Sequence, residues 1–138
     1  MTSQTDELSS DNPVAAGISS MMDWSVLDAL KVLQKPGRPD VCQMLITTFL
    51  SAIPPLMEST RAAVITSDGV ALRNTAHSMK SSSTAIGAVV FGKTCAELEF
   101  LGKSNTLDEA PALLQRAEYE LAETCAELRR AVESVPSP

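Results

Sequence analysis

The chain has 138 residues, 44% hydrophobic and 4% aromatic content, and a formal net charge of −6. It contains no run of about eighteen uninterrupted apolar residues, so the composition predicts one soluble domain and no membrane insertion. The negative charge, without a basic stripe to offset it, disfavours binding to the phosphate backbones of nucleic acids.

Composition also indicates the secondary structure and the compartment. Aromatic residues and glycine are sparse, whereas Ala, Leu, Ser and Glu are abundant, which favours an all-α fold. Cys42, Cys95 and Cys125 lie far apart without CxxC spacing, and an odd number of cysteines leaves one unpaired in any disulfide scheme. We therefore expect a reducing, cytoplasmic location.

Both ends of the chain are expected to lie outside the folded domain. Residues 1–20 are rich in Ser, Thr, Asp and Asn and lack the charged and apolar regions of a signal peptide. The sequence therefore predicts a flexible leader over residues 1–20, a helical domain over residues 21–134 and a frayed terminus over residues 135–138.

Two helices are expected in the first half of the domain. The first starts near Ser25, which resembles a capping partner of Asp28, and its apolar residues at helical spacing are Val26, Leu27, Leu30 and Leu33. After the KPGRP turn, Pro39 can occupy the first position of a helix that extends to Ile65. Two prolines at positions 54 and 55 should kink this helix without dividing it.

Three further helices are expected in the second half. Asp68 can cap one that extends to Ile86, with Gly87 in the left-handed conformation after it. The next covers residues 88–103 and ends near Gly102, and the last starts at Asp108. Its leucines recur every seven residues, at positions 107, 114, 121 and 128, each followed three residues later by a small residue. The small residues make this apolar stripe narrow, which favours packing within one chain over a coiled-coil dimer. We therefore expect a monomer.

These amphipathic helices can bury their apolar stripes most simply as an antiparallel four-helix bundle with a short additional N-terminal helix. The only histidine, His77, lies in the middle of the third helix, about 140° around the helix axis from Leu72 and so off its apolar stripe. Its neighbours along the same face are polar or basic: Arg73, Asn74, Lys80, Ser81 and, one turn further, Thr84.

Several interpretations of His77 are open from these residues. It is either an ordinary solvated histidine or a functional one. A metal site would need clustered ligands, and the cysteines lie on or near predicted core stripes, so we expect no bound metal. A hydrolase would need a GxSxG elbow or an oxyanion loop, and neither is present. A nucleophilic histidine needs only an accessible neutral imidazole, a nearby cation and small neighbours, which this pattern predicts.

Residues 76–103, AHSMKSSSTAIGAVVFGKTCAELEFLGK, resemble the signature of the histidine-containing phosphotransfer (HPt) domains of multistep phosphorelays. The positions that match are Ala76, His77, Lys80, Gly87, Ala88, Cys95, Leu98, Glu99 and Gly102, with Met79, Phe91 and Lys103 as similar replacements. The helix order extends the resemblance to residues 23–133. Ser81 departs from the pattern, because the family usually has glycine there.

The resemblance implies an HPt-like bundle in which His77 accepts a phosphoryl group from one receiver-domain phosphoaspartate and passes it to another receiver-domain aspartate. It implies that Lys80 neutralises the phosphoryl oxygens and that Glu99 orients the imidazole. Arg73 and Lys103 are expected near the phosphoryl group. The same basic and small-residue face around His77, which includes Ser81 and Thr84, is expected to contact partners.

The partners implied are the receiver domains of hybrid histidine kinases and response regulators. Receivers supply the Mg²⁺, so no cofactor is expected on this chain, and a phosphocarrier without kinase activity is the leading hypothesis. Two alternatives stay open. The chain could bind and sequester a receiver without carrying phosphate, or it could be the phosphoacceptor segment of a larger histidine kinase. Ser81 is small enough for function, with slower transfer or a narrower partner range expected.

Overall fold

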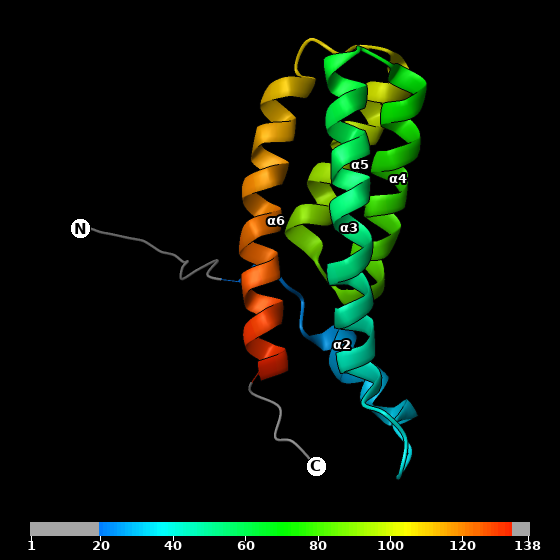
Figure 1. Cartoon of the computed structure of the whole chain (residues 1–138), viewed down its shortest axis with the longest axis vertical. Helices are drawn as coiled ribbons and strands as arrows, with labels where there is room; N and C mark the ends of the chain where they lie inside the picture. Colours follow the sequence, from blue (N-terminus) through cyan, green and yellow to red (C-terminus); the bar gives the residue numbers. More distant parts are fainter. Residues whose placement is uncertain (1–19, 134–138) are drawn as a thin grey trace, which may run out of the picture.

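The computed structural model describes residues 20–133, and these residues are entirely helical apart from turns and connections, which confirms the expected fold class (Figure 1). The elements in chain order are α2 (Ser25–Leu30), the 3₁₀ helix η1 (Lys31–Leu33), α3 (Val41–Ile65), α4 (Gly69–Ile86), α5 (Val89–Ser104) and α6 (Ala110–Glu133). Residues 1–19 of the expected leader (residues 1–20) and the expected frayed terminus at residues 135–138 lie outside the described residues.

The four long helices α3, α4, α5 and α6 form the bundle (Figure 1). Each of them packs against two others, in the order α3, α4, α5, α6 and back to α3, while α2 and η1 lie at one end against α3. Short connections make successive helices antiparallel. The core contains large side chains from all four helices: Phe49, Ile53, Leu72, Met79, Phe91, Leu98 and Leu128.

Several predicted helix ends are confirmed, and two are wrong. The Asp68 side chain accepts a hydrogen bond from the Ala71 amide, and Gly87 has a positive φ of 81° after α4. Asp40, however, is the N-cap of α3 and accepts from the Gln43 amide, so Pro39 precedes the helix instead of occupying its first position. At α2, both the amide and the hydroxyl of Ser25 donate to Asp23, so no Ser25 and Asp28 pair forms.

The two prolines lie inside a single helix, α3, as expected. Proline has no amide hydrogen, so two carbonyl groups in the preceding turn lose their usual intrahelical partner. By length and composition alone, α3 could cross a membrane. In the bundle one side of this helix, including Ile46, Phe49 and Ile53, is buried against the other helices.

The connection between α5 and α6 differs from the expectation. The helix α5 continues past Gly102 to Ser104, and Asn105 adopts the left-handed conformation with φ 56°. Asp108 lies in the turn before α6, which starts at Ala110. Gly102 is therefore a buried residue within α5, and its small size serves the packing of helices and not a helix end.

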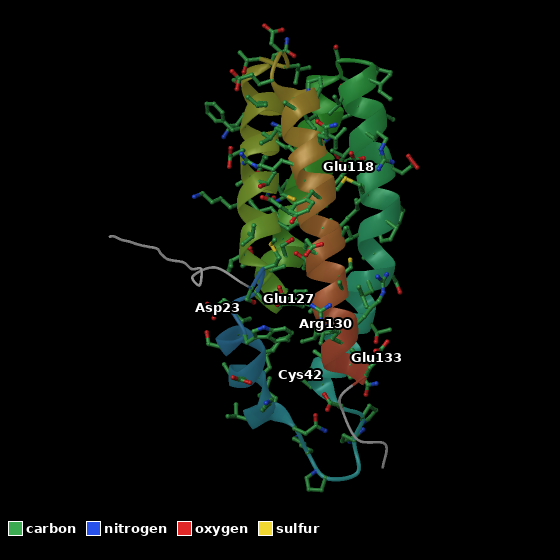
Figure 2. All side chains as sticks on the ribbon, turned by 90° about the vertical axis from the view of Figure 1, so that its left-hand side faces the viewer. Asp23, Cys42, Glu118, Glu127, Arg130 and Glu133 are labelled. Atoms are coloured by element: carbon green, nitrogen blue, oxygen red, sulfur yellow. The ribbon has the colours of Figure 1, made fainter. Side chains whose placement is uncertain are left out.

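Residues before α2 are attached to the last helix. The Met21 amide and the Ser20 hydroxyl both donate to the carboxylate of Glu127, at 2.6 and 2.8 Å. Glu127 belongs to α6 and lies beside the segment that leads into α2 (Figure 2). A second tie joins α6 to α3, where the Arg61 guanidinium donates to Glu118 at 2.6 Å. These bonds join α6 to the segment before α2 and to α3.

Candidate functional site

His77 lies halfway along α4, on the side that faces away from the core. The buried positions of this helix are Leu72, Ala76, Met79, Ser83 and Ile86. They recur every three or four residues, which leaves the side chain of His77 58% exposed. The imidazole is thus accessible to a second protein while its backbone is fixed by a well-packed helix.

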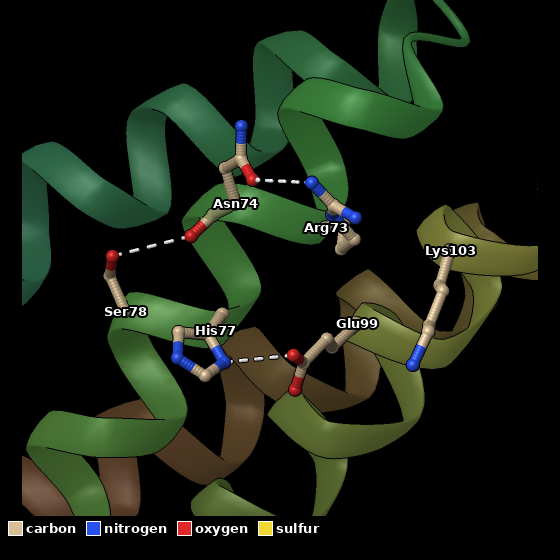
Figure 3. Close-up of a pocket in the computed structure, with 6 residues that line it drawn as sticks. All are labelled: Arg73, Asn74, His77, Ser78, Glu99 and Lys103. Carbon is tan, nitrogen blue, oxygen red and sulfur yellow. Dashed lines mark hydrogen bonds and ion pairs between the residues drawn. The ribbon is translucent and has the colours of Figure 1, made fainter.

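A carboxylate from the neighbouring helix connects His77 to Lys80. Oε2 of Glu99, on α5, lies 2.8 Å from Nδ1 of His77, and Oε1 of Glu99 lies 2.6 Å from Nζ of Lys80. Because Nδ1 faces the carboxylate, the other ring nitrogen, Nε2, points away from Glu99 (Figure 3). The structure therefore brings together the three residues that the resemblance implied for chemistry.

The Glu99 carboxylate is held in its ionised form. Lys80 lowers the pKa of this carboxyl below its usual value, and His77 lowers it further, although partial burial opposes both effects. The sign follows from charge: a nearby cation or hydrogen-bond donor stabilises the carboxylate and so makes protonation harder. Glu99 is consequently an anion throughout the neutral pH range.

A depression of about 420 Å³ opens beside the imidazole. It is lined by Arg73, Asn74, His77 and Ser78 from α4 and by Glu99 and Lys103 from α5 (Figure 3). Two of these residues, Asn74 and Ser78, were not predicted as site residues, although Asn74 lies three residues before His77 and so on the same helix face. The spacing of Ser78, directly after His77, gives no such signal. Their own bonds are local: Ser78 donates to the Asn74 carbonyl.

The other two predicted partner-binding residues do not line this depression. Ser81 is exposed one turn after His77 on α4. Thr84 is exposed one turn further, and its hydroxyl donates to the Lys80 carbonyl at 3.0 Å. Both are on the open side of α4 and are available to a partner that covers His77, but neither contributes to the cluster around Glu99.

The distance between the two helices of the site depends on glycine. A Cβ atom at Gly102 would lie only 2.6 Å from both the Arg73 amide nitrogen and the Gly69 carbonyl oxygen. These are backbone atoms, which cannot rotate away as a side chain could. Glycine therefore lets α4 and α5 approach closely next to Arg73, one position before Lys103 and three after Glu99.

Metal ligands do not gather in the described part of the chain. Within residues 20–133, no group of three or more His, Cys, Asp and Glu side chains is arranged to hold a metal ion. Cys95 is fully buried, and burial raises the pKa of its thiol to about 12, so it packs as a small apolar side chain. Cys42 and Cys125 are partly buried free thiols.

Comparison with known proteins agrees with this geometry. The Hpt domain model matches residues 44–133. Among solved structures, the chain is similar to histidine-containing phosphotransfer protein B (HptB) from Pseudomonas aeruginosa PAO1, with 30% sequence identity and a TM-score of 0.77 over 86% of this chain and 99% of that one. A search of curated proteins finds no match. Because the family model covers most of the chain, the protein belongs to the Hpt domain family.

Proposed function

We propose that His77 is the residue on which this phosphorelay intermediate carries the phosphoryl group. As an Hpt protein the chain is a histidine phosphotransfer intermediate, a phosphocarrier and not a kinase. One observation carries the assignment to His77: its Nδ1 is bound by Glu99 at 2.8 Å while its Nε2 faces outward on an exposed ring. It is also the only histidine in the chain.

The hydrogen bond to Glu99 determines which nitrogen of the His77 ring carries the hydrogen before transfer. An ionised carboxylate accepts hydrogen bonds and cannot donate them, so Nδ1 must carry the hydrogen. In a neutral imidazole the lone pair is then on Nε2, the nitrogen that faces outward. Glu99 therefore orients the nucleophile and aims its lone pair at an incoming phosphoaspartate.

Cations on both helices can stabilise the transferred group. Lys80 lies one turn after His77 on α4, and Arg73 and Lys103 line the depression beside the ring. Phosphoryl transfer spreads negative charge over three oxygens, and positioned cations lower the free energy of that transition state. We assign the main role to Lys80, since its Nζ is bound to the same Glu99 carboxylate as Nδ1 of His77.

The proposed partners are receiver domains, which Hpt proteins contact in phosphorelays. The donor is a receiver of a hybrid histidine kinase and the acceptor is the receiver of a response regulator, and each supplies its own Mg²⁺. We place the exchange in the cytoplasm. Ser81 and Thr84 on the open side of α4 would form part of the surface that the receiver covers.

The proposal is tested by incubating the chain with a phosphorylated receiver and Mg²⁺. The expected result is a label on this chain that is labile in acid and stable in alkali, as a phosphoramidate bond is. Binding of receivers without any label, across all receivers of the source organism, would instead favour a protein that sequesters receivers. Label from ATP on a kinase domain but from no receiver would indicate a segment of a larger histidine kinase.

Lys80→Ala is expected to slow phosphoryl transfer by about 10- to 100-fold, because a charge placed next to the migrating phosphoryl group is lost. Affinity for the unphosphorylated receiver should change much less. Rapid-quench kinetics with a labelled receiver measure the first quantity, and titration of the receiver measures the second. Lys93→Ala is the matched control, because this exposed lysine lies on α5 at a different depression. Equal rates for the Lys80 variant and the wild type would remove Lys80 from the mechanism.

Ser81→Gly is expected to leave the fold intact and to speed transfer or to widen the range of receivers that react. Ser81 is exposed, so the change removes only a small side chain from the path of the incoming receiver. Transfer rates from a panel of labelled receivers, compared with those of Ser104→Gly at an exposed helix end, provide the measurement. Unchanged rates with every receiver would show that the serine is neutral.

A further inference from the structure

We propose that the acidic stretch of the N-terminal leader, residues 6–11, lies across the depression beside His77 and shields the imidazole until a receiver displaces it. The surface is the depression that α4 and α5 line, and the occupant is a segment of the same chain that precedes the described residues. The consequence for phosphoryl transfer rests on the proposed function, whereas the contact itself does not depend on it.

The depression carries cations that no carboxylate neutralises. Within the described part of the chain, Arg73 and Lys103 line the depression and form no ion pair. Lys80 lies beside them, and its carboxylate partner, Glu99, is shared with the imidazole. Three cations and one carboxylate leave a positive local charge on a chain whose formal net charge is −6. The site therefore attracts an acidic segment.

The leader has the complementary charge. Before Ser20 the chain contains the acidic residues Asp6, Glu7 and Asp11 and no Lys, Arg or His. All three acids belong to the acidic stretch, so their charges are concentrated within six residues. Such a segment is attracted to a basic surface and repelled by the acidic remainder of the domain.

The point where the leader ends is fixed near the first turn of α5. Ser20 and Met21 are bound to Glu127 of α6, and the Met21 carbonyl accepts a hydrogen bond from the Val90 amide at 3.5 Å. Glu99 lies nine residues after Val90, which is about 14 Å along the helix. Because α5 packs between α6 and α4, the path to the depression also passes around one helix, which adds about 10 Å.

The acidic stretch is long enough to follow this path of roughly 25 Å. An extended chain spans about 3.3 Å per residue, so the nine residues from Ser20 to Asp11 reach about 30 Å and the thirteen residues to Glu7 reach about 40 Å. All three acids can therefore come to the depression while Ser20 stays bound to α6. Contact with other exposed cations of the chain is an outcome that the experiment distinguishes.

The contact is expected to be weak and reversible. An ion pair between exposed groups contributes little, because water and salt screen it. The leader is attached to the domain, however, so its effective concentration at the depression is on the order of millimolar. Covered and open forms should then have comparable populations, and a receiver can displace the leader. We expect the leader to slow reactions at His77 by about 2- to 5-fold.

The test uses the full chain with the triple change Asp6→Asn, Glu7→Gln and Asp11→Asn, called the leader variant. Diethyl pyrocarbonate is the probe, because it acylates exposed imidazole rings. His77 is the only histidine, so the ultraviolet absorbance of carbethoxyhistidine reports this residue alone. The leader variant should react about 2- to 5-fold faster than the wild type at low salt, and both should react equally at about 1 M salt.

Two controls separate the contact from a general effect of charge. The triple change Glu109→Gln, Glu123→Gln and Glu133→Gln removes the same charge from exposed positions, and it should leave the acylation rate unchanged. In a chain with Arg73→Gln and Lys103→Gln, the changes of the leader variant should give no further acceleration. Acceleration by the glutamate control, or undiminished acceleration without the two cations, would overturn the proposal.

Phosphoryl transfer from a labelled receiver to the leader variant should be faster by the same factor, because no acidic stretch has to be displaced. Faster acylation without faster transfer would overturn the shielding of His77 from receivers. Equal acylation of the wild type and the leader variant at low salt would show that the leader proposal is wrong, whatever the transfer rates. If acylation differs as expected but no receiver labels His77, the proposed function is wrong and the contact stands.

Discussion

His77→Gln is expected to abolish phosphoryl uptake completely while the bundle stays folded and still binds receivers. Glutamine has no ring nitrogen with a nucleophilic lone pair, so no bond to phosphorus can form. The replaced side chain is exposed and contributes nothing to the core, so the free energy of unfolding should change little. The measurement is the label on the chain after incubation with a labelled receiver, with receiver binding measured in parallel.

The result of this experiment can be assigned to one residue. His77 is the only histidine, so no second histidine can take over the label. Ser78→Ala provides a control variant: it alters the same rim of the depression but should still be labelled, because the hydroxyl of Ser78 bonds only to the Asn74 carbonyl. Residual acid-labile label on His77→Gln would show that the phosphoacceptor lies elsewhere.

Gly102→Ala is expected to destabilise the bundle by about 1–3 kcal/mol, although alanine is the better helix former. The new methyl group would lie 2.6 Å from two backbone atoms of α4, so the two helices must separate. Separation would also move Glu99 away from His77, which should slow phosphoryl transfer. Thermal unfolding should show a midpoint lower by about 5 °C or more, and rapid-quench kinetics measure transfer.

The matched control for this change is Gly92→Ala. Gly92 also lies within α5, but its added Cβ would meet the Ser83 side chain at 3.2 Å and no backbone atom at short range. This contact is much less close than the one at Gly102, and alanine favours the helix, so the loss of stability should be much smaller than for Gly102→Ala. Equal unfolding midpoints for both variants would contradict the close approach of α4 and α5 at Gly102.

Much of the fold could be predicted because each long helix carries its own local signals. Asp68 and Gly87 mark the two ends of α4 through a cap and a left-handed residue, and both act within a few residues of themselves. The position of His77 off the apolar stripe followed from the helical period alone. Caps and helical spacing can be recognised from the residues of a single helix, whatever the other helices of the bundle do.

Features that join two helices were harder to predict. The sequence showed Gly102 near a helix end, and only the crossing with Arg73 and Gly69 reveals that glycine is needed for packing. Glu99 was placed beside His77 by the family resemblance and not by spacing, since the two residues are on different helices. Its simultaneous bond to Lys80 depends on side-chain geometry that no periodic pattern contains.

The most direct test of the central claim is a nuclear magnetic resonance measurement on the phosphorylated chain with ¹⁵N-labelled histidine. A single histidine gives one pair of ring nitrogen signals, so assignment is unambiguous. The account predicts coupling between phosphorus and Nε2 of His77. Coupling to Nδ1, or a phosphoryl group on any other residue, would contradict it.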